Sequence, residues 1–208
     1  KILKPRGKII IEVQYFPKML KDFTFDNIYH EHVNYWSMQA LNKFCKLNGL
    51  KIFKVEEIDT HGGSIRVYIT KEKKIKIESS VNKILKKESI NGILEDKIFL
   101  NYGQKIDNLN NNLKRNLKKL NKKYKLIVGY GAPAKASTVI NFAGITNKDI
   151  KFVIDDNKLK KNKFIPGTNI KIVSKKNIKN ADCVIVFAWN FYSEIKKNNS
   201  DIGKKFLS

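Results

Sequence analysis

The stretch KLIVGYGAPAKASTVINFAG, residues 125–144, decides the fold of the second half of this 208-residue chain. It begins with an apolar run that ends in glycines, which is typical of a buried β-strand followed by a tight turn. Small residues then open a helical pattern, and two more apolar runs follow, IKFVIDDN at 150–157 and DCVIVFAW at 182–189. Strand, glycine turn, helix and strand in this order predict a βαβ unit with parallel strands. We therefore predict the α/β class, with a Rossmann-like core at residues 124–190.

The turn GYGAPAK, residues 129–135, does not have the GxGxxG spacing of a dinucleotide-binding loop. Its glycines still permit the backbone to approach a ligand, and the helix that follows offers N–H groups to an anion. The candidate ligand-binding residues here are Gly129, Gly131, Ala132, Pro133, Lys135 and Ser137, with Thr138 nearby. The alternative is a turn that packs the helix on the strand and binds nothing.

The first part of the chain predicts another set of elements. Residues 8–14, KIIIEVQ, are rich in β-branched side chains and predict a strand. Between Ser37, the expected N-cap, and Gly49, the expected stop, apolar residues follow helical spacing. KIFKVEEI at 51–58 and SIRVYIT at 64–70 alternate apolar and polar residues like paired strands, with the turn DTHGG between them.

Residues 71–123 are highly polar, but apolar side chains recur in them at helical intervals. They are Ile90, Ile93, Leu94, Ile98, Ile106, Leu109, Leu113, Leu117 and Leu120. This spacing predicts one or two long amphipathic helices. For residues 71–90 a solvated connector is the open alternative.

The formal net charge of +23 suggests a nucleic-acid partner, but the distribution of the charge argues against one. Only three of the 42 basic residues are arginine, the residue that reads bases by paired hydrogen bonds. The lysines are spread over the whole chain rather than gathered in one segment. We therefore expect no nucleic-acid partner, although a general preference for anions is plausible.

No run of about 18 apolar residues is present, so we expect no membrane-spanning segment. The first residues lack the apolar core of a signal peptide, and there is no initiator methionine, so we expect a piece of a longer protein. Cys45 and Cys183 lie far apart among apolar residues, without a CxxC pair. They predict reduced, buried thiols in a cytoplasmic protein.

The segment FDNIYHEHVNYWS, residues 25–37, holds two of the three histidines of the chain. A histidine near neutral pH accepts a proton, a neighbouring carboxylate orients its ring, and a tyrosine hydroxyl stabilises a developing oxyanion. Tyr29, His30, Glu31 and His32 together therefore suit the removal of a proton from a carbon next to a carbonyl. We take these four residues as the candidate catalytic group.

Two alternatives to a catalytic role stay open. The pair of histidines could bind a metal, but a catalytic zinc usually needs three protein ligands, and His61 would be the third only if the fold brought it near. We predict no metal site. The other alternative is structural, with histidines and tyrosines hydrogen-bonded to one another in a buried loop.

The third histidine opens a second glycine-containing segment, HGGSIRVY, residues 61–68. Its cation and hydroxyl suit an anionic or hydroxylated ligand. The candidate substrate-binding residues are His61, Gly62, Gly63, Ser64 and Arg66. The alternative is a β-turn in which the histidine only caps the backbone.

These segments together resemble a family. KPRGKIIIEVQY, FDNIYHEHVNYWS, HGGSIRVY, GYGAPAKAST, IDDN and PGTNIKI, in this order, are similar to the C-terminal part of the sugar C-methyltransferases that use S-adenosyl-L-methionine. The prototype of the family methylates a dTDP-linked 4-keto deoxysugar at C3. The resemblance covers most of the chain and is weakest in residues 71–123. It implies that residues 1–36 end the methyltransferase domain, with its last strand and active-site loop, and that residues 37–208 form the Rossmann-like C-terminal domain.

The resemblance also implies roles. His32 would be the general base, Tyr29 and Glu31 would bind or polarise the keto sugar, and the resulting enolate would attack the methyl group of S-adenosyl-L-methionine. An upstream domain would bind that cofactor, because this chain has neither its glycine loop nor the zinc-ligand cysteines of the family. We expect residues 129–138 on the nucleotide-sugar side of the cleft with Lys135 near a phosphate, or else in domain docking. The alternative function is a nucleotide-sugar-binding module without catalysis.

Overall fold

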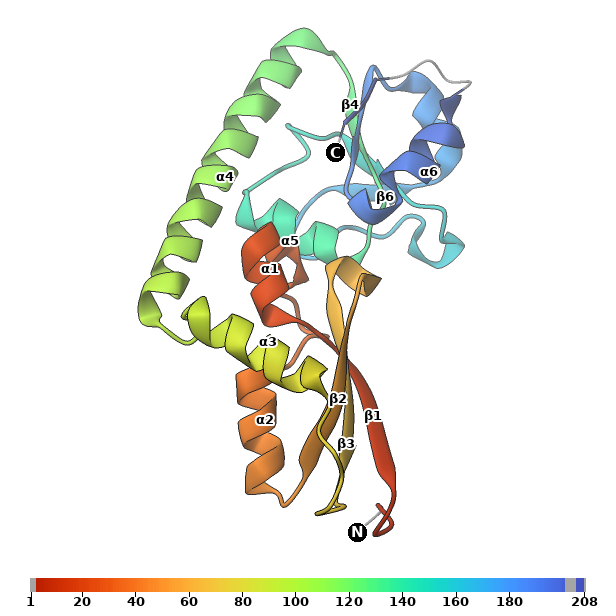
Figure 1. Cartoon of the computed structure of the whole chain (residues 1–208). Coiled ribbons are helices and arrows are strands. Elements are labelled where there is room, and N and C mark those ends of the chain that lie inside the picture. The colour runs from red at the N-terminus through yellow and green to blue at the C-terminus, as the bar shows by residue number, and fades with distance from the viewer. Residues whose placement is uncertain (1–2, 201–204, 208) are drawn as a thin grey trace. The chain divides into compact units, whose positions relative to one another are not determined.

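The computed structural model describes residues 3–200 and 205–207, without the side chains of His61 and Lys205. The chain forms two compact units; in Figure 1 the first is drawn mostly in red to yellow and the second mostly in green to blue. The first unit contains Lys1–Phe25 and His32–Gln104, and the second contains Asp26–Glu31 and Lys105–Ser208. Each is described by itself below.

The first unit is built on a three-stranded antiparallel sheet in the order β1-β3-β2 (Figure 1). Its strands are β1 (Lys8–Gln14), β2 (Lys51–Ile58) and β3 (Ser64–Thr70), as the alternating sequences predicted. β3 lies in the middle, and its partner on one side is the whole of β1, from Lys8 opposite Thr70 to Gln14 opposite Ser64. The predicted boundary after residue 36 is therefore not where the compact units divide. As a statement about the whole protein that boundary stays a prediction.

Helices α1 (Phe16–Asp22), α2 (Met38–Leu47) and α3 (Ser79–Ile90) complete the first unit. α2 begins as predicted, because the Ser37 hydroxyl accepts a hydrogen bond from the amide of Ala40 at 3.1 Å. A second acceptor closes the same helix end. The buried carboxylate of Glu88, in α3, accepts the amides of Met38 and Gln39 at 2.6 and 2.8 Å. A carboxylate suits this place because the N-terminus of a helix carries partial positive charge.

The polar stretch 71–123 contains two helices, α3 and the 28-residue α4 (Asp96–Lys123). The helical prediction is confirmed, and the connector is confined to the residues before α3. Ile106 and Leu117 are the buried members of the apolar face of α4. The leucines on this face contribute to the core of the second unit.

The second unit contains a five-stranded sheet in the order β6-β5-β4-β7-β8, and every pairing in it is parallel. The strands are β4 (Ile127–Tyr130), β5 (Phe152–Ile154), β6 (Lys171–Val173), β7 (Cys183–Val186) and β8 (Lys205–Leu207). Helix α5 (Ala134–Phe142) connects β4 to β5. The predicted parallel βαβ unit of the α/β class is confirmed.

Both faces of this sheet are covered, which explains its continuous apolar runs. On one face, Ile127 of β4 packs in a core with residues of α4 and α5. On the other face, Val128 packs in a second core with the 3-10 helix η4 (Lys175–Asn180) and α6 (Tyr192–Lys197). Cys183 is buried in the first core, and Cys45 is buried in the first unit. Both thiols are buried, as predicted.

The strand order reverses next to β4, since the chain goes first to β5 and β6 and later to β7 and β8 on the other side. In parallel α/β sheets, ligands bind at the carboxyl ends of the strands where the order reverses. The residues that follow β4, β5 and β7 therefore mark the place to search for a site in this unit.

Candidate functional site

The predicted catalytic segment is an irregular loop that is anchored at both ends. It begins with the 3-10 helix η1 (Phe25–Asn27), in which the side chains of Asp26 and Asn27 are buried. It ends where Trp36 forms an isolated bridge with Tyr15, just before α2. Between these points the chain has no helix or strand, as expected.

The two compact units divide within the YHEH motif, since Tyr29, His30 and Glu31 belong to the second unit and His32 to the first. Tyr29 is half-buried and meets the ring of His30 edge-on, with centroids 6.0 Å apart. His30 and Glu31 are exposed. The structure thus brings Tyr29 and His30 into contact, and both belong to the same unit as Glu31.

His32 is half-buried, and its ring stacks on Tyr35 at 6.3 Å between centroids with an angle of 20°. An imidazole in this state is held in orientation by its aromatic neighbour and is still reached by solvent. Proton transfer requires both properties, because the base must be positioned and must have access to the proton. The catalytic role of His32 stays a prediction.

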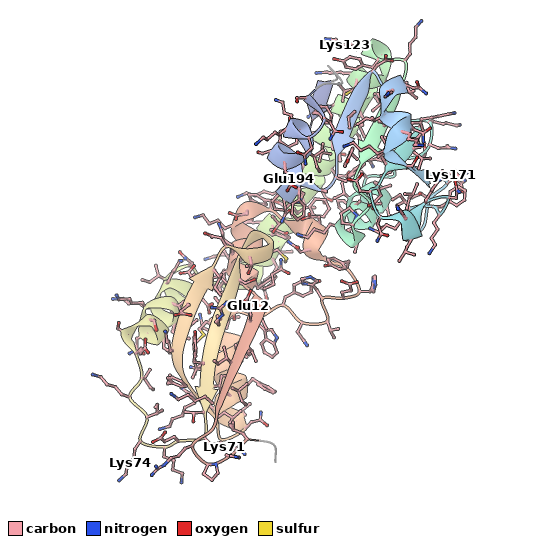
Figure 2. All side chains as sticks on the ribbon, turned by 90° about the vertical axis from the view of Figure 1, so that its right-hand side faces the viewer. Glu12, Lys71, Lys74, Lys123, Lys171 and Glu194 are labelled. Atoms are coloured by element: carbon pink, nitrogen blue, oxygen red, sulfur yellow. The ribbon has the colours of Figure 1, made fainter. Side chains whose placement is uncertain are left out.

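The second candidate segment, HGGSIRVY, is largely committed to contacts within the first unit. Arg66 Nη2 donates a hydrogen bond to Glu12 Oε2 at 2.9 Å, and Glu12 is its partner on the neighbouring strand β1. Figure 2 labels Glu12 on the sheet of the first unit. This hydrogen bond raises the pKa of Arg66 above its ordinary value. The buried hydroxyl of Ser64 donates to the backbone oxygen of Thr60 at 3.2 Å. A ligand at Arg66 would have to compete with the carboxylate of Glu12.

Around the glycines of this segment the backbone takes unusual angles. Gly62 and Gly63 have φ values of 86° and 116°, which favour glycine, and the oxygen of Gly63 accepts the amide of Tyr15. They form the connection between β2 and β3 through the 3-10 helix η2 (Thr60–Gly62). The side chain of His61 lies outside the described part of the structure, so its predicted role rests on the sequence.

The glycines of the third segment have a packing role. A Cβ atom on Gly129 would lie 2.8 Å from Phe187 Cε2 and from Val153 Cγ2. A Cβ atom on Gly131, which has φ of 86°, would lie 2.6 Å from Ala188 Cβ. Both positions therefore require glycine because β5 and the end of β7 pack against the turn. The proposal that their backbone approaches a ligand stays a prediction.

A carboxylate of the protein itself closes this turn. The amide of Gly131 donates to the Ile154 oxygen, and the amide of Ala132 donates to Asp155 Oδ2, each at 2.7 Å. Lys160 Nζ donates to the Ala132 oxygen at 2.9 Å and to Asp155 Oδ2 at 3.3 Å. Asp155 follows β5 directly, and its carboxylate occupies the donors that a pyrophosphate would use in a dinucleotide-binding fold. The turn therefore does not offer these donors to the pyrophosphate of a dinucleotide.

Lys135, in the first turn of α5, has surroundings that differ from those of Lys160. Lys135 Nζ is buried, and it has no hydrogen-bond acceptor among the residues that the structure describes. It lies 5.2 Å from the centroid of the Trp189 ring. Burial lowers the pKa of Lys135, and the nearby charge of Asp26 opposes this shift. A buried ammonium without an acceptor favours the arrival of an anion, because an anion would supply the missing hydrogen bond.

Trp189 and Asp26, which the sequence analysis did not single out, lie near Lys135. Trp189 Nε1 donates a hydrogen bond to Asp26 Oδ2 at 2.7 Å, although the residues are 163 positions apart. Trp189 is in the 3-10 helix η5 (Trp189–Phe191), which follows β7, and Asp26 lies three residues before Tyr29. No periodicity or motif signals a contact of this kind. The only hint is that both lie in segments already singled out, FDNIYHEH and DCVIVFAW.

Trp189 also lies at the wall of an apolar cavity in the second unit with a volume of about 240 Å³. Side chains from α4, α5 and β7 line it, together with the residues that follow α5 and β7. They are Leu113, Leu117, Val139, Ile145, Ile150, Ile185, Val186, Phe187 and Trp189. Ser137, the remaining candidate, is half-buried in α5, where its backbone oxygen accepts from the side chain of Asn141.

Neither a metal centre nor a membrane span is found in the part of the chain that the structure describes. Its histidine, cysteine and acidic side chains form no group of three or more that would hold a metal ion. Within the same residues, no helix combines the length and the apolar character needed to cross a bilayer.

Comparison with known proteins gives two matches. A family profile described as the C-methyltransferase C-terminal domain matches residues 59–206. The C-methyltransferase NovU of Streptomyces niveus is 30% identical over 212 residues, which cover 99% of this chain and 50% of that protein. The chain thus spans about half the length of this relative.

Proposed function

Since the chain belongs to the C-methyltransferase C-terminal domain family, we propose that it is the C-terminal part of an S-adenosyl-L-methionine-dependent C-methyltransferase. Its substrate in this proposal is a nucleotide-linked keto-deoxysugar. The observation that carries the proposal is the similarity to a C-methyltransferase along 99% of the chain, including the YHEH loop.

In the proposed reaction His32 accepts a proton from the carbon next to the keto group. The two electrons of the broken C–H bond then form the enolate, and its negative charge moves to the keto oxygen. Tyr29 donates a hydrogen bond to this oxygen, and Glu31 stabilises the protonated imidazole. His30, in ring contact with Tyr29, holds the tyrosine in place.

S-adenosyl-L-methionine would supply the methyl group that the enolate carbon receives. We infer that the glycine turn after β4 does not bind the cofactor, because Asp155 accepts the Ala132 amide and Ala188 packs against Gly131. We propose that the cofactor binds to a region that corresponds to the half of NovU outside the match.

Lys135 is the proposed contact for a phosphate of the nucleotide sugar. Its ammonium group is buried and has no acceptor among the described residues, whereas the Gly131 and Ala132 amides of the glycine turn are already hydrogen-bonded within the fold. The phosphate therefore meets the start of α5 and not the turn itself. The partial positive charge at the N-terminus of α5 adds to the attraction.

The test is methyl transfer by the full-length polypeptide with His32→Gln. We expect turnover to fall by about two to four orders of magnitude, which is the usual contribution of a general base. His30→Gln, which alters the neighbouring imidazole, should give a much smaller loss. Equal losses for the two variants, or near-normal turnover for His32→Gln, would remove His32 as the base.

A second candidate function is a nucleotide-sugar-binding or domain-docking module without catalysis. The buried Lys135 favours it, because that site lies within the second unit alone. Calorimetry of this chain with dTDP and dTDP-sugars separates the two functions. Binding of a dTDP-sugar to this chain, together with a full-length protein that transfers no methyl group, would support the binding module. Methyl transfer by the full-length protein would exclude it.

A further inference from the structure

We propose that Trp189 is the positioning residue of the YHEH loop, with its indole N–H fixing the loop and its ring face fixing Lys135. The inference rests on the proposed function, since it assigns the loop a catalytic role. It goes further by naming the residue that couples the loop to the phosphate contact.

The first contact is the hydrogen bond between Trp189 Nε1 and Asp26 Oδ2. At 2.7 Å it is short, and its acceptor is a carboxylate that is only 6% exposed. Hydrogen bonds to a buried charged group are about twice as strong as those between neutral groups. This bond therefore holds Asp26 firmly against the residue that follows β7.

A second hydrogen bond, made by another residue, holds the loop two positions after Asp26. The hydroxyl of Thr138, in α5, donates to the backbone oxygen of Ile28 at 3.3 Å. Tyr29 follows Ile28 directly. Two elements at the carboxyl edge of the parallel sheet, η5 and α5, thus hold the segment that carries the proposed oxyanion donor.

The ring face of Trp189 has a separate partner. Lys135 Nζ lies 5.2 Å from the ring centroid, within the distance of a cation–π interaction. Trp189 is 37% exposed, so burial in a core does not explain a tryptophan at this position. One side chain accordingly contacts both the acidic anchor of the loop and the cation proposed to bind phosphate.

The two contacts of Trp189 can be separated by substitution. Trp189→Phe keeps an aromatic face for Lys135 but removes the N–H that binds Asp26. Asp26→Asn keeps an oxygen that accepts from the indole but removes the charge. Phe191→Leu, at a residue of the same turn that is 59% exposed, is the matched control.

Hydrogen exchange of this chain tests the contact without any assay of activity. In Trp189→Phe the amides of residues 26–31 should exchange faster, while those of β4 and β7 keep their wild-type rates. Asp26→Asn should speed the exchange of residues 26–31 less than Trp189→Phe does, because its amide oxygen still accepts a weaker hydrogen bond, and Phe191→Leu should leave the wild-type rates. Unchanged exchange of residues 26–31 in Trp189→Phe would overturn the inference.

Kinetics of the full-length enzyme test the consequence. We expect Trp189→Phe to lower kcat about tenfold and to change the KM for the nucleotide sugar less than about threefold, because a displaced loop weakens the transition state and not the phosphate contact. Asp26→Asn should lower kcat less than Trp189→Phe does, since its amide oxygen still accepts a weaker hydrogen bond from the indole. Faster exchange with an unchanged kcat in Trp189→Phe would overturn the positioning role. A wild-type protein without methyl transfer would instead refute the proposed function, while the exchange data would still decide the contact.

Discussion

Two segments of the chain, HGGSIRVY and GYGAPAKAST, look alike in sequence because each joins glycines to a cation. In the structure the cations differ. Arg66 lies on the middle strand β3, opposite Glu12 on one side and Glu56 on the other, and it is bonded to Glu12. Lys135 lies in the first turn of α5, and its buried Nζ has no hydrogen-bond acceptor among the described residues.

The difference teaches that the surroundings of a cation, and not its neighbours in sequence, decide whether it is available to a ligand. A residue in the middle of an antiparallel sheet receives partners from both flanking strands, and their register selects them. A residue in the first turn of a helix after a parallel strand points to the edge where ligands bind. We therefore place the anion contact at Lys135 and regard Arg66 as part of the sheet.

The largest expected effect is on the free energy of unfolding and concerns the glycines of GYGAPAKAST. These glycines have a structural role, although Lys135 of the same segment is available to a ligand. Gly131→Ala should lower the free energy of unfolding by about 3 kcal/mol, because the new Cβ would have both an unfavourable φ and a clash with Ala188. Gly144→Ala is the control, since Gly144 also has positive φ but no atom within 4 Å of its Cβ position. It should lose only about 1 kcal/mol. Urea unfolding measures both, and equal losses would show that the packing against Ala188 is unimportant.

Next in size is the effect of removing the cation itself. Lys135→Met should weaken nucleotide-sugar binding about tenfold, or about 1.4 kcal/mol, while the folded state becomes no less stable. The stability is retained because a buried ammonium without an acceptor is unfavourable. Calorimetry and urea unfolding of the same variant give the two values. Weaker binding together with a large loss of stability would make Lys135 a structural residue.

The same residue predicts a dependence on pH. Because burial lowers the pKa of Lys135 in the folded state, the unfolded chain binds more protons between the lowered pKa and the ordinary value of 10.5. Stability from this group therefore rises as the pH increases through that range. The difference in unfolding free energy between Lys135→Met and wild type should shrink as the pH rises toward 10.5, and a difference that does not change with pH would contradict the burial of the charge.

The smallest effect is expected for the ion pair between Arg66, in HGGSIRVY, and Glu12. A double-mutant cycle of Glu12→Gln and Arg66→Lys should give a coupling free energy of no more than about 1 kcal/mol, because both side chains are partly exposed. The coupling should decrease with added salt. Arg66→Lys should also raise the KM for the nucleotide sugar less than Lys135→Met does. A larger rise for Arg66→Lys would reverse the assignment of the anion contact.

The sequence was sufficient for the elements with strong periodicity. The strands at 8–14, 51–58 and 64–70, the helix after Ser37 and the parallel βαβ unit all form as predicted. β6 and β8, with three residues each, were not predicted. Their pairing is decided by the neighbouring strands of the sheet and not by their own sequence.

Less of the candidate site than of the secondary structure could be predicted from the sequence. The motifs pointed to the YHEH loop and to Lys135, because histidines, glycines and cations have distinctive chemistry. They did not reveal that Asp155 closes the glycine turn or that Trp189 binds Asp26. Contacts of this kind depend on which loops meet at the edge of a sheet, and one sequence carries no period or spacing that encodes the meeting.

The most direct test of the central claim is deuterium exchange into the sugar. The full-length protein is incubated in D₂O with a nucleotide-linked keto-deoxysugar and S-adenosyl-L-homocysteine, and deuterium at the carbon next to the keto group is measured by mass spectrometry. The account predicts that wild type introduces deuterium and that His32→Gln binds the sugar but does not. Exchange by His32→Gln at the wild-type rate would contradict it.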